Sequence, residues 1–169
     1  MTRLVEDPVL KQRYEFRHEG DMLIVEAWVD PGGGVTPHTH PAMQEHFEVL
    51  SGEIEFLVGR KWVKTDDVLV PPGTRHAYRN VGGTTAHMLT RVTPPRELEQ
   101  FLTDVAELAQ QRRFTRRGLP TSPTAVPELA RVAQRYRDTV VLETPLRPLL
   151  PLLARIGSSR TAGHSTAMR

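Results

Sequence analysis

The chain has 169 residues, of which 38% are hydrophobic and 25% charged, with a formal net charge of +2 and no cysteine. This length favours one domain with an extension, and the lack of cysteine excludes a disulfide framework and a thiolate metal site. The first residues lack the apolar core of a signal peptide, and no apolar run approaches the length of a membrane span. We therefore expect a cytoplasmic protein.

The first part of the chain has the pattern of a β protein. Residues 1–20 alternate weakly and predict an early strand, and residues 21–29 predict a clear strand with one apolar face. Residues 53–58 and 61–64 predict a tight hairpin, and residues 84–92 a last strand. Short strands at regular spacing with glycine and proline turns are typical of an all-β barrel or sandwich.

One stretch between Gly32 and Gly52 has the residue types of a metal site. His38 and His40 lie two positions apart, and in an extended segment such side chains point to the same face. The prolines at 37 and 41 favour extension, because a residue before proline is pushed away from helix. Glu45 opens the next apolar strand and can fold back beside the histidines. Two imidazoles and one carboxylate that converge predict metal chemistry.

A second stretch, residues 66–80, contains an apolar strand, a Pro-Pro-Gly turn and a third histidine. Together the two stretches resemble the two sequence motifs of the cupin family over roughly residues 21–93. The first has the pattern Gly-x5-His-x-His-x4-Glu-x6-Gly at every fixed position: Gly32, His38, His40, Glu45 and Gly52. The second has the pattern Gly-x5-Pro-x-Gly-x2-His-x3-Asn at Pro71, Gly73, His76 and Asn80, with Thr65 in place of the first glycine.

The resemblance implies a mainly β fold, a double-stranded β-helix related to the jelly roll, whose interior holds a small ligand near a metal. It implies that one divalent first-row metal binds to four residues: His38, His40, Glu45 and His76. Nitrogen and oxygen donors suit iron, manganese, nickel, cobalt and zinc alike. The alternative is that these histidines are structural residues of the core.

Other residues near the motifs are candidates for the pocket. Tyr78 has the same strand parity as His76 and is expected to line the pocket. Gln44 precedes a predicted ligand and is expected to turn inward as a hydrogen-bonding neighbour of the site. His46 follows Glu45, so strand alternation places it on the outer face.

The composition changes after the Pro94-Pro95 pair, which suggests a barrel at residues 1–95, a helical extension at 96–156 and a disordered tail at 157–169. Two to three helices are expected in the extension. The first has apolar residues at helical spacing: Leu98, Phe101, Leu102, Val105 and Leu108. The second is centred on residues 126–136. Residues 140–142 predict a short extended piece, and the leucine-rich stretch 146–156 predicts one or two short helices.

Charge is distributed unevenly along the chain. Residues 1–96 carry 11 basic against 13 acidic side chains, whereas residues 97–169 carry 11 against 7, and all 11 are arginine. The arginine-rich linker at 112–117 lacks the interleaved aromatic residues of a nucleic-acid platform, so we expect no nucleic-acid partner. We expect no membrane partner either, because packing is the commoner fate of the 146–156 leucines. The apolar face of the extension and the tendency of cupin barrels to pair predict a homodimer, with the extension packed on the barrel or on the partner.

The predicted function is a metalloenzyme that acts on a hydrophobic or aromatic carbonyl or enol compound. Resemblance to cupin dioxygenases implies oxygen chemistry on an enolate or catecholate. Resemblance to cupin isomerases and cyclases implies Lewis-acid catalysis, in which a pocket base moves a proton. The alternative from another class is a non-catalytic cupin that binds or senses a small ligand, since this fold hosts many functions.

Overall fold

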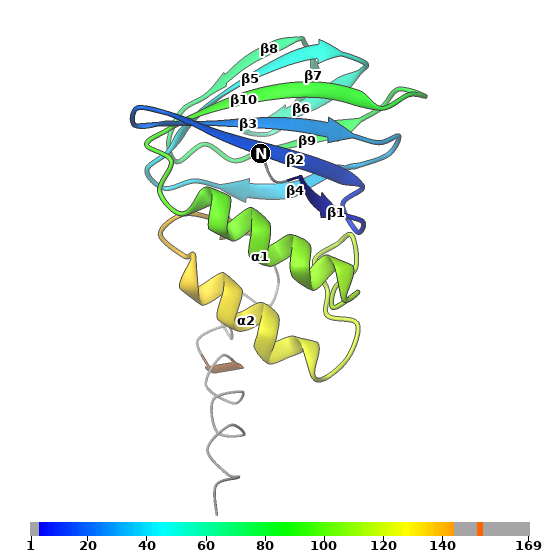
Figure 1. The fold of residues 1–169 in the computed structure, drawn as a ribbon, viewed down its shortest axis with the longest axis vertical. Coiled ribbons are helices and arrows are strands. Elements are labelled where there is room, and N and C mark those ends of the chain that lie inside the picture. Colours follow the sequence, from blue (N-terminus) through cyan, green and yellow to red (C-terminus); the bar gives the residue numbers. More distant parts are fainter. Residues whose placement is uncertain (1–3, 144–151, 154–169) are drawn as a thin grey trace, which may run out of the picture.

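The computed structural model describes residues 4–143 and 152–153, and its strands form two antiparallel sheets that face each other (Figure 1). The first sheet has the order β1 (Val5–Asp7), β2 (Gln12–Glu19), β3 (Met22–Val29), β10 (Ala86–Thr93), β5 (Gln44–Ser51), β8 (Asp67–Val70). The second has the order β11 (Val141–Leu142), β4 (Gly34–Thr39), β9 (His76–Asn80), β6 (Ile54–Val58), β7 (Lys61–Lys64). Successive strands from β3 onward alternate between the sheets except within hairpins. The fold is a double-stranded β-helix, as predicted.

The core lies between the two sheets because the strands alternate in polarity. β3 pairs with β10 so that inward residues oppose one another, for example Ala27 and Met88. The predicted inward residues of these two strands are all buried: Leu23, Val25, Ala27, Val29, Ala86, Met88, Thr90 and Val92. The hairpin between β6 and β7 also forms as predicted.

Two fixed positions of the motifs shape turns. Gly52 has a φ of +87°, and a Cβ atom there would lie 2.6 Å from the Cα of Ala86, so no other residue fits without a shift of the backbone. The buried amide of Asn80 donates to the carbonyls of Val29 at 2.7 Å and Thr84 at 2.8 Å. These residues hold the frame that positions the histidines.

Thr65, which replaces a motif glycine, fits its position. Its φ is not left-handed, and its hydroxyl accepts the N–H of Asp67 at 3.3 Å and donates to the carbonyl of the same residue at 3.0 Å. β8 begins at Asp67 directly after this turn. The turn therefore forms in this chain without glycine.

The C-terminal part places two helices on one side of the barrel, α1 (Leu98–Gln110) next to the strands and α2 (Ala125–Arg135) beyond it (Figure 1). The arginine-rich linker between them is part of an ordered loop, closed by a bridge between Phe114 and Pro120. None of the helices in the described residues is long and apolar enough to cross a membrane. The leucine-rich stretch 146–156, apart from 152–153, and the tail 157–169 lie outside the described residues.

The extension shares one hydrophobic core with the barrel. Leu98 and Phe101 of α1, and Tyr136 directly after α2, belong to the same buried cluster as the inward residues of the strands. After α2 the chain returns to the barrel, where Leu142 of β11 pairs opposite His38 of β4. The predicted extended piece at 140–142 is thus an added strand beside the candidate ligands.

Candidate metal centre

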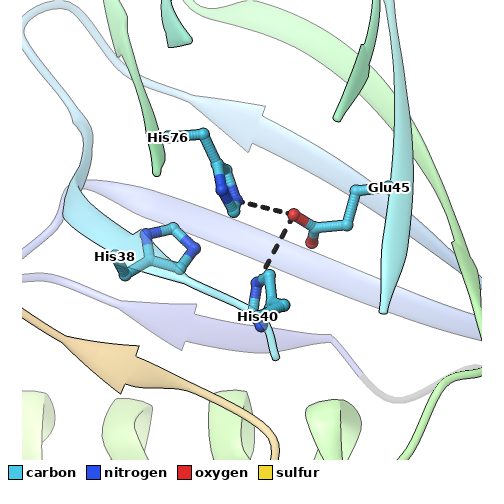
Figure 2. Close-up of side chains that lie close together, drawn as sticks. All are labelled: His38, His40, Glu45 and His76. Carbon is cyan, nitrogen blue, oxygen red and sulfur yellow. Dashed lines mark ion pairs between the residues drawn. The ribbon is translucent and has the colours of Figure 1, made fainter. Parts of the chain in front are cut away.

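Three neighbouring segments of the barrel bring the four candidate ligands together. His38 lies in β4 directly opposite His76 of β9, His40 follows the end of β4, and Glu45 lies in β5. One ligand atom from each residue lies within 4.8 Å of the others. Figure 2 shows the three imidazoles and the carboxylate directed toward a common centre. The spacing of the sequence motifs therefore predicted which side chains converge.

Each imidazole is oriented by one backbone carbonyl. The Nδ1 atom of His38 lies 2.9 Å from the carbonyl oxygen of Thr36, and that of His76 lies 2.9 Å from the carbonyl oxygen of Thr74. The Nδ1 atom of His40 lies 2.7 Å from the carbonyl oxygen of Thr139. A carbonyl oxygen only accepts, so each Nδ1 carries the hydrogen and donates it. Each neutral ring therefore presents the lone pair of Nε2, the arrangement that neighbours of metal-binding histidines impose.

The carbonyl that orients His40 comes from the extension. Thr36 and Thr74 each precede their histidine by two residues, whereas Thr139 lies 99 residues after His40. Thr139 is buried between α2 and β11. Sequence reasoning missed this contact because a backbone carbonyl has no side-chain signature.

The carboxylate of Glu45 completes the group. Its Oε2 atom lies 2.7 Å from Nε2 of His76 and 3.4 Å from Nε2 of His40 (Figure 2). Among the described residues, neither Glu45 Oε2 nor His76 Nε2 has a hydrogen-bond partner, although both atoms are buried. Two lone-pair donors that face each other at this distance repel unless they share a proton or both bind one metal ion, and buried polar atoms are rarely left unpaired. The orphaned pair thus fits a site built for a cation.

The electrostatics of the site keep the donors ready for a cation. Burial lowers the pKa of His38 to about 3, and the nearby His76 and His40 push it in the same direction. Burial also lowers the pKa of His40, but the charge of Glu45, the contact with its carboxylate and the Thr139 carbonyl together offset this effect, and the net shift is upward. Burial raises the pKa of Glu45, but the charges of His40 and His76 and their contacts with the carboxylate together outweigh it and hold that pKa well below its usual range. At neutral pH Glu45 is a carboxylate and His38 is uncharged, which is the form each needs to bind a metal.

The donor set fits a divalent first-row metal. Metal–nitrogen bonds of about 2.1 Å place ligands on opposite sides of an ion about 4.2 Å apart, close to the 4.8 Å spread of the four atoms. Three imidazoles and one carboxylate, without sulfur, suit iron, manganese, nickel, cobalt and zinc. In a six-coordinate ion, four protein ligands leave two positions for a small molecule.

A partly open cavity of about 180 Å³ lies over these residues and is lined by the barrel and the extension. Its floor includes His38, His40 and Glu45. Its roof is formed by apolar residues of the two helices: Leu98, Phe101, Leu102, Val105, Leu108, Val126, Leu129 and Val132. An engineered cavity of about 150 Å³ accommodates benzene, so this one is large enough for a single small aromatic molecule.

The remaining predicted site residues divide into two groups. Tyr78 is buried and lines the cavity, as predicted. The prediction for Gln44 is wrong, because its side chain is exposed at the start of β5. Glu45 points inward, and strand alternation therefore turns Gln44 outward. His46 lies on the outer face, as predicted, where its Nε2 contacts Asp67 at 2.8 Å.

Comparison with known proteins identifies the fold of this region. A family model described as "Cupin domain" matches residues 25–92. An RmlC-like cupin from Shewanella frigidimarina NCIMB 400 is 19% identical, with a TM-score of 0.52 over 59% of this chain and 89% of that chain. KdgF from Halomonas sp. is also 19% identical, with a TM-score of 0.52 over 56% of this chain and 89% of its own. No curated protein sequence matches the chain, and identities this low show a shared fold alone.

Proposed function

We propose that this chain, whose residues 25–92 match the cupin domain, is a metal-dependent enzyme for a small hydrophobic or aromatic carbonyl or enol compound. The observation that carries this proposal is the group of converging, unpartnered donor atoms on the floor of an apolar cavity. When bound, a divalent metal supplies Lewis acidity toward a carbonyl or enolate oxygen and, for redox-active ions, access to oxygen chemistry.

The protein's own groups prepare the site before any ligand enters. Backbone carbonyls fix the three imidazole rings, so little reorientation is needed when a cation binds. The carboxylate of Glu45 offsets one unit of the charge of a divalent ion. The roof lines the cavity with apolar side chains, and a less polar surrounding strengthens electrostatic interactions at the floor.

The cavity wall favours an aromatic ligand. The ring of Phe47 is buried and lines the cavity, with its centroid 6.2 Å from that of His76 and 6.0 Å from that of Tyr78. Aromatic rings at such distances attract one another in tilted or offset arrangements. A planar ligand beside Phe47 would therefore reach the candidate ligands with its oxygen atoms.

Turnover of defined compounds separates the reaction classes. Metal-loaded protein is incubated with catechol and with 1-phenyl-1,3-butanedione, in air with an oxygen electrode and without oxygen in heavy water with detection by NMR. The His76→Ala variant serves as the matched control. Oxygen uptake that matches loss of the compound supports a dioxygenase-type reaction. Deuterium exchange without oxygen supports an isomerase- or cyclase-type reaction. Binding without either reaction contradicts an enzyme and supports the non-catalytic alternative.

We also propose that two copies of the chain associate as a homodimer through the barrel edges. β8 and β7 end the two sheets, and they expose apolar side chains, with Leu69 at 51%, Trp62 at 40% and Val63 at 40% exposure. Open edges of this kind are commonly paired or covered. Light scattering at tens of micromolar tests this proposal, and a monomer there contradicts it.

A further inference from the structure

A second group of polar side chains lies on the cavity wall, outside the four candidate ligands. β1 and β2 pair so that Asp7 lies opposite Gln12 and Val5 opposite Tyr14. Residues that face each other across paired strands share one face of the sheet, and diagonal neighbours remain within reach of long side chains. Asp7, Gln12 and Tyr14 are all buried on this face. Tyr78, from the facing sheet, joins them by donating its hydroxyl to Oε1 of Gln12 at 2.8 Å.

Two members of this group have hydrogen-bonding capacity to spare. The hydroxyl of Tyr14 is buried, with the residue only 2% exposed; it lies near the hydroxyl of Tyr78, but it makes no well-formed hydrogen bond within the described part of the chain. Oδ1 of Asp7 accepts the N–H groups of Val9 at 2.9 Å and Leu10 at 2.8 Å, but Oδ2 receives no hydrogen bond from the part of the chain that is described. Both residues line the cavity. An unsatisfied buried polar group destabilises the fold, and a ligand that supplies the missing partner removes this cost.

One member of this group, Tyr78, lies close to the candidate metal centre. Tyr78 follows His76 by two residues in β9, so both side chains point to the same face, about 7 Å apart along the strand. The ring of Phe47 lies near both, with its centroid 6.2 Å from that of His76 and 6.0 Å from that of Tyr78. A ligand that lies along Phe47 can therefore contact His76 and Tyr78 at the same time.

We propose that Asp7 and Tyr14 form a second polar subsite, which binds a hydroxyl group on an aromatic ligand whose carbonyl or enol oxygens lie at the candidate metal centre. The carboxylate of Asp7 accepts the hydrogen of that hydroxyl, and the hydroxyl of Tyr14 donates to its oxygen. The assignment rests on the proposed function for the position of the ligand's other end. It narrows the substrate class to hydroxylated aromatic carbonyl or enol compounds.

The test uses chelating probes that differ by a single hydroxyl. Benzohydroxamate and its 3-hydroxy and 4-hydroxy derivatives are titrated into cobalt-loaded full-length protein, with affinity measured by calorimetry and coordination by the cobalt absorption spectrum. One hydrogen bond contributes about 0.5–1.5 kcal/mol, or roughly a 2- to 12-fold change in affinity. We expect at least one hydroxylated probe to bind about 5-fold more tightly than benzohydroxamate, within that range.

Three variants assign the preference to the subsite. Tyr14→Phe and Asp7→Asn remove one polar function each with little change in shape, and both should abolish the preference, measured within each variant as the ratio of the affinities for the hydroxylated probe and for benzohydroxamate. Tyr136→Phe is the matched control, because this buried tyrosine donates to Asp104 at 2.7 Å instead of facing the cavity. It should keep the full preference. Equal affinities for all three probes, or a preference that survives both subsite substitutions, overturns the assignment.

A stability readout separates binding from a merely structural role. Because the hydroxyl of Tyr14 makes no well-formed hydrogen bond among the described residues, Tyr14→Phe should melt at the same temperature as the wild type or higher. A clearly lower melting temperature shows that the hydroxyl supports the fold and contradicts the subsite.

A metal-independent pair of probes keeps this test distinct from that of the proposed function. Phenol and toluene, which do not chelate, are titrated into chelator-treated protein. Failure of the protein to take up cobalt refutes the metal centre alone. In that case the subsite is still supported if the protein binds phenol more tightly than toluene and Tyr14→Phe loses this difference. Cobalt uptake without any hydroxyl preference refutes the subsite alone.

Discussion

The barrel and the C-terminal extension contribute to the candidate metal centre in different ways. The barrel supplies all four side chains, and it orients His38 and His76 through carbonyls that lie two residues earlier in the chain. The described part of the extension supplies none of the four candidate ligands. It covers the cavity with two helices and orients His40 through the carbonyl of Thr139. Local geometry therefore fixes two of the imidazoles, whereas the third depends on a long-range contact.

The barrel alone therefore forms an incomplete metal site. β11 pairs with β4 beside His38, and the hydrogen bond from His40 to Thr139 is buried. Removal of the extension would free one ligand ring to rotate and open the cavity to water. We infer that cation binding and the docking of residues 139–143 stabilise each other, because a ligand that binds only the docked form stabilises that form.

The largest expected effect comes from removal of the whole extension. Truncation after Pro95 exposes the barrel face that packs against Leu98, Phe101 and Tyr136. Burial of each such side chain contributes roughly 1.5–3 kcal/mol, against a total stability of about 5–15 kcal/mol for a typical domain. We expect the truncated chain to aggregate or to lose cooperative unfolding in circular dichroism. A soluble, cooperatively folding barrel would show that the extension is dispensable for the fold and would contradict this expectation.

The next effect concerns Asp7, which lines the cavity on the barrel side and lies in β1, near α1 (Figure 1). Burial raises the pKa of Asp7 from 3.8 to about 6, although its bonds to two backbone N–H groups oppose the shift. The facing Tyr14 and Tyr78 stay uncharged because burial raises their pKa values further. A group that binds its proton more tightly in the folded state stabilises the fold fully below pH 4, and this contribution is lost as the pH rises through 6.

We therefore expect the free energy of unfolding of the wild type, relative to Asp7→Asn, to fall by roughly 2 kcal/mol between pH 4 and pH 7. Asparagine keeps the oxygen that accepts the two backbone N–H groups, so the variant isolates the charge. Urea unfolding at a series of pH values measures the difference. A difference that stays constant with pH would show that the carboxyl of Asp7 is well hydrated.

A shorter truncation isolates the contact between the extension and His40. Truncation after Asp138 removes the carbonyl of Thr139 and β11 but keeps both helices. Truncation after Glu143 keeps the carbonyl, β11 and both helices, and serves as the control. Loss of a group that orients a metal ligand typically lowers metal affinity 10- to 100-fold. We expect such a loss only in the shorter chain, measured by competition with a metal indicator. Equal affinities would mean that the barrel orients His40 without help.

The smallest effect lies within the barrel, far along the chain from the extension. Thr65→Gly restores the motif glycine, but it removes two hydrogen bonds to Asp67 and increases the freedom of the unfolded chain. We expect a loss of about 1 kcal/mol in the free energy of unfolding and no change in metal affinity. A gain in stability would show that the turn prefers glycine.

The same division explains what the sequence could predict. Motif spacing identified the four converging side chains, because strand register places His38 opposite His76 in one sheet and the barrel brings Glu45 of the other sheet to face them. Strict use of alternation would also have turned Gln44 outward. The contact with Thr139 could not be predicted, because it depends on how the 98 residues between His40 and Thr139 fold. Asp7 and Tyr14 were missed because their burial results from the pairing of β1, β2 and β3 and the roof above them.

The most direct test of the central claim is the metal content of a set of histidine and glutamate variants, by elemental analysis after dialysis against limiting metal. We expect about one equivalent of metal per chain in the wild type and a sharp loss of metal in the four ligand variants: His38→Ala, His40→Ala, Glu45→Ala and His76→Ala. His46→Ala and His87→Ala are matched controls, because these histidines contact Asp67 and Glu26 outside the group. They should keep the full equivalent. Wild-type metal content in His38→Ala, His40→Ala and His76→Ala alike would contradict the candidate centre.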